Sequence, residues 1–168
     1  MPTVSSDYED LTECALSAEL EQELVAVQRE CVFMWTNNAG EAFGVVMSYL
    51  PKDGTLWLTA AERRARISAI RRFPRASVCI NSTGTKMGGG KTVTYKGSCI
   101  VHADRETKDW FYPEFCRYLR GDTPAAAAFQ AFLDSPHRVI IEFTPDYKLS
   151  FDGALMWQRS PEVARRPD

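Results

Sequence analysis

The run Thr55-Leu-Trp-Leu-Thr59 leads directly into Ala60-Ala-Glu-Arg63-Arg-Ala-Arg66-Ile-Ser-Ala-Ile70-Arg-Arg-Phe73-Pro74. The first run is typical of a strand, and the second of a short turn and a helix of about three turns that stops before the proline. At ~100° per residue, Arg63 and Arg66 fall on the apolar side of this helix. Both also lie in its first turn, where the helix dipole disfavours cations and free N–H groups attract anions.

Three explanations are open for these two arginines. They hold an anion, such as a phosphate, between the helix start and their guanidinium groups. Alternatively, they pair with a buried carboxylate, or they lie on a solvated face of a helix whose phase differs from the predicted one.

Charge is distributed unevenly along the chain. The protein has 168 residues, 45% of them hydrophobic, and a net charge of −2, which is typical of a single globular domain. Residues 1–30 carry eight acids and one base, a net charge of −7, whereas residues 62–96 carry nine bases and one acid, a net charge of +8. The basic middle suits nucleic acid, a phosphorylated small molecule or an acidic segment of the same chain.

Several classes of protein are disfavoured. The five cysteines form no CxxC pair, which indicates reduced thiols and a cytoplasmic location. No run approaches the ~18 apolar residues of a membrane span, and no secretory leader is recognisable. The chain also lacks an aromatic RNA-binding strand and helix-turn-helix spacing, so we expect neither a membrane nor a nucleic-acid partner.

The rest of the chain predicts a loose acidic arm (1–16), one domain (17–158) and a polar tail (159–168). Within the domain, the patterns predict six or seven strands and three or four helices. Expected strands are 31–36, 43–49, 55–59, 76–81, 91–101, 138–144 and 148–157, and expected helices are 17–29, the arginine helix, 105–120 and 124–133. Hairpin-linked strands in this order favour a mainly β, antiparallel barrel with helices around its rim.

The segment Gly88-Gly-Gly-Lys91-Thr92 is not a P-loop. Thr85 stands where that motif needs its first glycine, and an alternating, strand-like run follows instead of a helix. The segment is either a plain hairpin loop or a mobile lip beside a binding site, with Lys91 and Thr92 at the start of the next strand.

Histidine and aromatic residues leave further alternatives. His102 and His137 have no metal-ligand partners at suitable spacing, so no metal site is expected, although a single histidine could bind haem iron. No GxSxG motif is present.

The aromatic run from Trp110 to Tyr118 either packs against the barrel or a second subunit, or forms a pocket wall for a planar ring.

The order of these pieces resembles the split-barrel flavin and deazaflavin oxidoreductases, the superfamily of pyridoxamine 5′-phosphate oxidase. The resemblance covers about Leu20 to Trp157. It rests on a leading helix, a hairpin with Asn-Ala-Gly40, and the segments Leu56-Trp-Leu-Thr59, Ile70-Arg-Arg-Phe-Pro74-Arg-Ala-Ser-Val78 and Lys91-Thr-Val-Thr-Tyr-Lys-Gly97.

The resemblance implies a six- to seven-stranded antiparallel split β-barrel that forms a homodimer, with FMN at the subunit interface. Backbone groups of Val46, Met47 and Ser48 would run beside the cofactor ring. The positions implied at the cofactor phosphate and ribityl chain are Thr59, Arg63, Arg64, Arg66, Lys91 and Thr92. The register of the arginine turn leaves open which arginine touches the phosphate.

The chain also departs from pyridoxamine phosphate oxidases. It has Val45 and Leu50 where those enzymes have an arginine and a lysine around the ring-binding strand, and its last strand lacks their substrate-binding arginine and histidine. We therefore expect hydride transfer to or from another small organic molecule, performed by the cofactor with no catalytic side chain.

Alternatives remain open on the same fold. One is a reductase that uses the deazaflavin coenzyme F-420, whose anionic tail would suit Arg71, Lys86 and Lys91. Another is a non-enzymatic flavin- or haem-binding protein.

Overall fold

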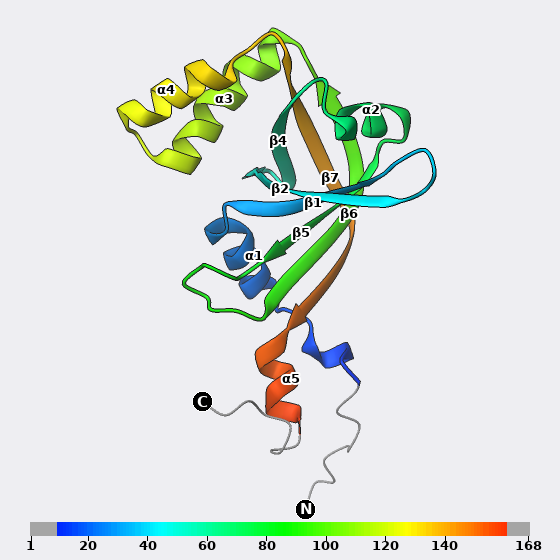
Figure 1. Cartoon of the computed structure of the whole chain (residues 1–168). Coiled ribbons are helices and arrows are strands. Elements are labelled where there is room, and N and C mark those ends of the chain that lie inside the picture. Colours follow the sequence, from blue (N-terminus) through cyan, green and yellow to red (C-terminus); the bar gives the residue numbers. More distant parts are fainter. Residues whose placement is uncertain (1–9, 161–168) are drawn as a thin grey trace, which may run out of the picture.

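The computed structural model describes residues 10–160, which form one curled antiparallel sheet with helices around it (Figure 1). The sheet has seven strands in the order β2-β1-β5-β6-β7-β4-β3. The strands are β1 (Glu30–Thr36), β2 (Ala42–Ser48), β3 (Leu50–Lys52), β4 (Thr55–Ala61), β5 (Arg75–Asn81), β6 (Lys91–His102) and β7 (Arg138–Asp152). The helices are η1 (Thr12–Cys14), α1 (Ala18–Val27), α2 (Ala65–Arg72), α3 (Arg105–Arg120), α4 (Pro124–Leu133) and α5 (Gly153–Arg159).

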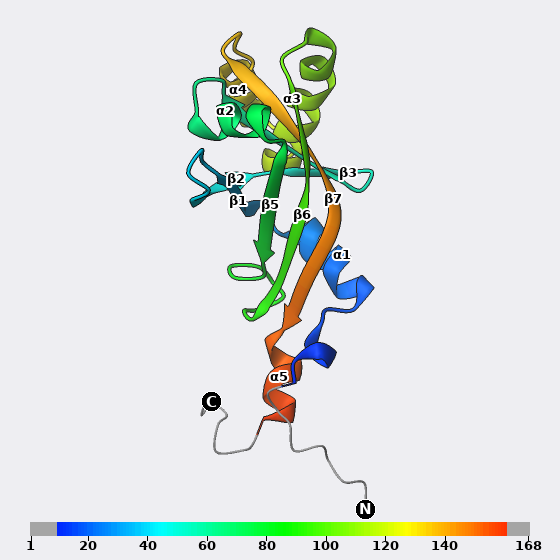
Figure 2. The same cartoon turned by 90° about the vertical axis from the view of Figure 1, so that its right-hand side faces the viewer.

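The two edge strands of the sheet, β2 and β3, follow one another in the chain and are separated by Tyr49 alone. The sheet therefore curls until its edges approach, without a ladder between them. This is the split barrel that the sequence predicts. β6 and β7 are the longest strands and extend from the α2 end of the molecule to the α5 end (Figure 2).

Alternate residues of every strand but β3 fill the inside of the barrel. Phe33, Val78 and Ile141 are fully buried there, and Leu24 of α1 and Ile67 of α2 complete this core. A second cluster lies on the outer side of β3 and β7, where Phe111 and Phe115 of α3 pack on Leu50 and Ile140. The aromatic run of α3 therefore mainly packs, as the first of its two interpretations has it.

Local signals predict several elements well. α3 and α4 have the expected limits, Asp104 and Thr123 cap them, and Pro124 is the first residue of α4. Ser17 caps α1 by accepting a hydrogen bond from the N–H of Leu20. The hairpin between β1 and β2 turns at Gly40, which has a φ of 80°.

Four expectations differ from the structure. α2 begins at Ala65, so Arg63 lies in the preceding turn and not on an apolar stripe. Phe73 follows the helix and is exposed. Residues 138–152 form one continuous strand, and 153–159 are helical, so the separate strand 148–157 is wrong. In the predicted arm, residues 1–16, Cys14 and Leu16 are buried, so the arm is not loose throughout. Residues 1–9 of the arm and 161–168 of the tail lie outside the described residues.

Among residues 10–160, no helix combines the length and apolar character needed to cross a membrane.

Candidate functional site

The turn between β4 and α2 presents backbone N–H groups and arginines together. Arg64 occupies the N-cap position of α2, and no side chain caps the helix. Arg66 is the second helical residue and is half-buried, whereas Arg63 and Arg64 are exposed. An uncapped helix start beside three cations has the chemistry of an anion site.

Arg138 joins this group from a distant part of the chain. It is the first residue of β7 and pairs with Ala61 at the end of β4. The Nε atoms of Arg66 and Arg138 are both buried, and neither has a hydrogen-bond partner. Buried donors are rarely left unpaired in proteins. The charge of Arg138 acts on Arg66, so the two side chains are near one another, and their unpaired Nε atoms indicate a candidate anion-binding site.

Electrostatics support the same interpretation. Burial lowers the pKa of the Arg66 guanidinium, and the charges of Arg64 and Arg138 lower it further. Two nearby acids are already bound: Arg71 holds Glu62 at 2.9 Å, and Arg105 holds Asp134 at 2.8 Å. The explanation by a buried carboxylate partner therefore fails within residues 10–160.

Thr59 lies near this cluster but is used within the fold. Its hydroxyl donates to the carbonyl of Val139 at 2.9 Å and lies 3.4 Å from the Tyr112 hydroxyl. It would have to break the first bond to donate to a phosphate.

The three β2 residues predicted to lie beside the ring differ in environment. Val46 is 65% exposed on the outer side of the sheet, Met47 is buried in the core, and Ser48 is half-buried. β2 is an edge strand, so the backbone groups on its free side have no strand partner and are available to a ligand.

Lys91 and Thr92 lie apart from the arginines. They begin β6, and Lys91 faces Asp152 at 3.8 Å beside the start of α5. The opposite end of β6 pairs with Ile140, close to Arg138, and a strand of this length spans on the order of 35 Å. One chain does not bring the two groups into one site.

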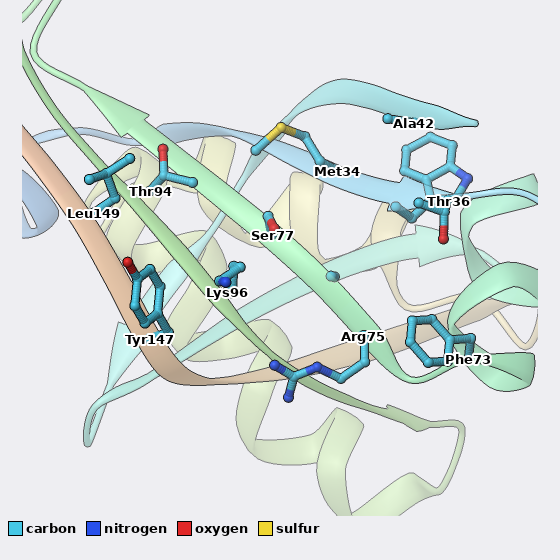
Figure 3. Close-up of a pocket in the computed structure, with 12 residues that line it drawn as sticks. Met34, Thr36, Ala42, Phe73, Arg75, Ser77, Thr94, Lys96, Tyr147 and Leu149 are labelled. Carbon is cyan, nitrogen blue, oxygen red and sulfur yellow. The ribbon is translucent and has the colours of Figure 1, made fainter. Parts of the chain in front are cut away.

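A groove of about 550 Å³ lies on the outer face of β1, β5, β6 and β7 (Figure 3). Its walls include Met34, Phe73, Tyr147 and Leu149, and the last three are more than half exposed. Arg75 at its edge is bound to Asp146 and Ser98. An open apolar surface of this kind is typical of a protein or ligand interface.

His102 is not available as a haem ligand in this arrangement. Its Nε2 lies 2.7 Å from a Glu142 oxygen, and its Nδ1 lies 3.7 Å from Asp104. Among residues 10–160, no group of three histidine, cysteine or acidic side chains could hold a metal ion.

Sequence reasoning missed Arg138. A local signal was present, because an arginine opens a predicted strand, but nothing in the sequence pairs that strand with the end of β4. The orphaned Nε atoms identify it only once β7 lies beside β4.

The fold is the antiparallel split barrel that the resemblance in sequence order predicts, and solved structures of other proteins share it. A conserved hypothetical protein from Mycobacterium tuberculosis, Rv2991, has a similar structure with a TM-score of 0.71 and 17% identity, over 84% of this chain and 88% of that protein.

Two similar structures have more informative names. An F-420 reductase matches with a TM-score of 0.59 and 16% identity, over 76% of this chain and 94% of its own. A putative pyridoxamine 5′-phosphate oxidase from Listeria innocua matches with a TM-score of 0.57 and 17% identity, over 78% and 97%. Identities this low show the fold alone. No protein-family model and no curated protein matches the sequence.

Proposed function

We propose that this protein is an FMN-dependent oxidoreductase that works as a homodimer on a small organic substrate other than pyridoxamine phosphate. The observation that carries the proposal is the pair of buried, unpartnered guanidinium atoms at an uncapped helix start. That donor set fits the phosphate of a flavin mononucleotide. Solved structures with this fold include an F-420 reductase and an FAD-binding protein, which supports a flavin-type cofactor.

The chain's own residues would bind and orient the cofactor. Arg64, Arg66 and Arg138 would hold its phosphate, and the free edge of β2 near Val46 and Ser48 would hydrogen-bond its ring. When bound, FMN supplies hydride transfer. Apolar groove residues such as Phe73 would exclude water from the neighbouring surface.

A second copy of the chain would complete the site. The groove exposes apolar side chains that a monomer leaves in water, and Leu149 is 67% exposed. Lys91 and Thr92 could meet the arginines only from a partner, since β6 separates them within one chain. Both facts support a dimer with the cofactor at its interface.

Coenzyme F-420 has less support. Two of the three cations that would suit its anionic tail are already in ion pairs, Arg71 with Glu62 and Lys86 with Glu23.

Titration of the purified protein with each cofactor tests the proposal. We expect FMN fluorescence to be quenched on binding, and a reductant such as NADPH or dithionite to reduce the bound flavin, which then passes electrons to an acceptor. Tighter binding of F-420 than of FMN would favour the deazaflavin alternative. A Soret band after haem addition, with no flavin binding, would contradict the proposal.

The dimer is tested by Leu149→Asp. An unpaired charge in a buried interface costs roughly 3–5 kcal/mol, and a two-fold interface contains the change twice. We expect the variant to be monomeric in light scattering at micromolar concentration and to bind FMN weakly.

The matched control is Phe132→Asp. Phe132 is 74% exposed on α4 and is not part of the groove. This variant should remain dimeric. Equal behaviour of the two variants would argue against the groove as the interface.

A further inference from the structure

We propose that a cavity between α1 and the hairpin of β3 and β4 binds an organic amine, with the ammonium group at the Glu21 carboxylate and an apolar body against the walls. The cavity has a volume of about 430 Å³, a size typical of small-molecule sites. Its lining comes from one face of α1, from the hairpin, and from single residues of β6 and β7. Because no cofactor is needed for this binding, the proposal goes beyond the proposed function.

The cavity is separate from the arginine turn. Leu56 lines the cavity near the start of β4, whereas Ala61, the partner of Arg138, ends that strand. The stretch of strand from Leu56 to Ala61 corresponds to about 17 Å. Figure 2 shows α1 and the β3 hairpin on one side of the molecule and α2 on the other. A ligand in this cavity therefore does not reach the arginines.

Both sides of the cavity are anchored, so it exists before a ligand binds. The hydroxyl of Tyr49, a fully buried residue, donates to the carbonyl of Val25 in α1 at 2.8 Å. On the other side, Lys52 of the hairpin forms an ion pair with Glu114 of α3 at 2.8 Å. These contacts tie α1 to the barrel and the hairpin to α3. A cavity with fixed walls requires less ordering when a ligand binds.

Glu21 provides a charged acceptor in the lining of the cavity. Its side chain is 12% exposed, and one oxygen accepts a hydrogen bond from the Tyr95 hydroxyl at 2.7 Å. Burial first, and then the hydrogen bond and charge of Glu21, raise the pKa of Tyr95, so the phenol stays protonated and remains the donor. Lys148 binds the other oxygen. A carboxylate has about four acceptor sites, so Glu21 can still accept from a ligand.

The charges that line the cavity favour a cation over an anion. The two acids are Glu21 and Asp53, and Asp53 forms no ion pair or side-chain hydrogen bond within residues 10–160. Lys52 is the one base among the described residues of the lining, and Glu114 already binds it. An anionic ligand would therefore meet two carboxylates and no available cation, whereas an ammonium group would meet two acceptors.

The rest of the lining suits an apolar group. Val25, Leu56 and Pro145 contribute aliphatic carbon, and the nearly buried Tyr95 contributes its ring. Pro51 has no N–H to offer a ligand. The cavity thus combines a charged acceptor with apolar walls, and an arylalkylamine such as 2-phenylethylamine has both matching parts.

Calorimetric titration of the whole chain tests the site with three probes of similar shape. These are 2-phenylethylamine, the neutral 2-phenylethanol and the anionic phenylacetate. We expect the amine to bind at least about tenfold more tightly than either analogue, because a hydrogen bond to a charged group is stronger than a neutral one. Equal affinities for the three probes would overturn the proposal.

Glu21→Gln keeps an acceptor for Tyr95 and removes the charge. We expect it to weaken amine binding about tenfold or more and to leave 2-phenylethanol within about threefold. The matched control is Glu23→Gln, because Glu23 lies in the same helix, is outside the lining and pairs with Lys86 at 3.4 Å. This control changes the net charge equally and should keep the amine affinity. An equal loss in both variants would show only long-range attraction and would overturn the site.

Ala26→Phe tests the cavity without a change of charge. Ala26 lines the cavity from an exposed position of α1, so a phenyl group there would occupy the space that the ligand needs. We expect this variant to keep its circular dichroism spectrum and to lose amine binding. Unchanged amine affinity in Ala26→Phe, or no amine binding by the natural protein at millimolar concentration, would overturn the proposal. Amine binding without FMN binding would support the cavity and refute only the proposed function.

Discussion

Replacement of Arg66 by alanine is expected to weaken FMN binding about 10- to 150-fold. Hydrogen bonds to charged groups contribute roughly 1.5–3 kcal/mol, and each 1.4 kcal/mol is a tenfold change in affinity. Arg66 lies in the first turn of α2, where its guanidinium and the free N–H groups would converge on the same phosphate. The dissociation constant is measured from quenching of FMN fluorescence at fixed ionic strength.

Arg72→Ala is the matched control for this experiment. Arg72 lies at the other end of the same helix and is exposed. It changes the net charge equally, so a comparable loss in both variants would show only long-range attraction. An unchanged FMN affinity in Arg66→Ala would show that the phosphate does not bind at this turn.

A double variant tests whether Arg66 and Arg138 act on the same phosphate. If Arg66 and Arg138 bind the same phosphate, Arg66→Ala combined with Arg138→Gln should not be additive, with a coupling of roughly 0.5–3 kcal/mol. Additive losses would place the two arginines on different parts of the ligand.

The position of α2 shows where sequence reasoning stops. Helical periodicity identified the helix and Pro74 its end, but the predicted start was too early. The structure keeps Glu62 and Arg63 in a turn because the N–H of Glu62 bonds to His137, far along the chain. A local pattern contains no information on that bond.

β7 shows the same limit in a strand. Pro145 suggests an interruption, since proline lacks an N–H for a ladder. The strand continues because the ladder between β6 and β7 shifts register there: Lys96 and Gly97 are adjacent in β6 and pair with Tyr147 and Pro145, so β7 has one extra residue, Asp146. The true end of β7 does have a local signal: Asp152 caps α5 by accepting a hydrogen bond from Ala154 at 2.9 Å.

The candidate site combines residues from one segment of the chain with residues that strand pairing brings together. Arg64 and Arg66 follow from one continuous segment, so their proximity to a helix start was predictable. Arg138 lies at the site because β7 pairs with β4. The same pairing places the carbonyl of Val139 where it accepts a hydrogen bond from the Thr59 hydroxyl. Strand partners distant in sequence therefore decide which predicted residues are free to bind.

We expect a side chain added at Gly97 of β6 to destabilise the fold strongly. A Cβ at this position would lie 2.2 Å from the carbonyl oxygen of Thr144 and 2.9 Å from Cζ of Phe143. The first contact is with backbone, in the middle of the sheet, so the strands themselves must move. We expect Gly97→Ala to lower the free energy of unfolding by about 3 kcal/mol or more. For a chain of this size the unfolding midpoint should fall by roughly 6–12 °C.

Gly89→Ala is the control for the loss of glycine. Gly89 lies in the loop before β6, and a Cβ there would have no atom within 4 Å. Its unfolding midpoint, followed by circular dichroism, should stay within about 2 °C of the natural protein. A similarly small change in Gly97→Ala would mean that β6 and β7 can separate at low cost. The irregularity opposite Pro145 would then not be held in place by this close approach, and another contact would have to fix the register between β6 and β7.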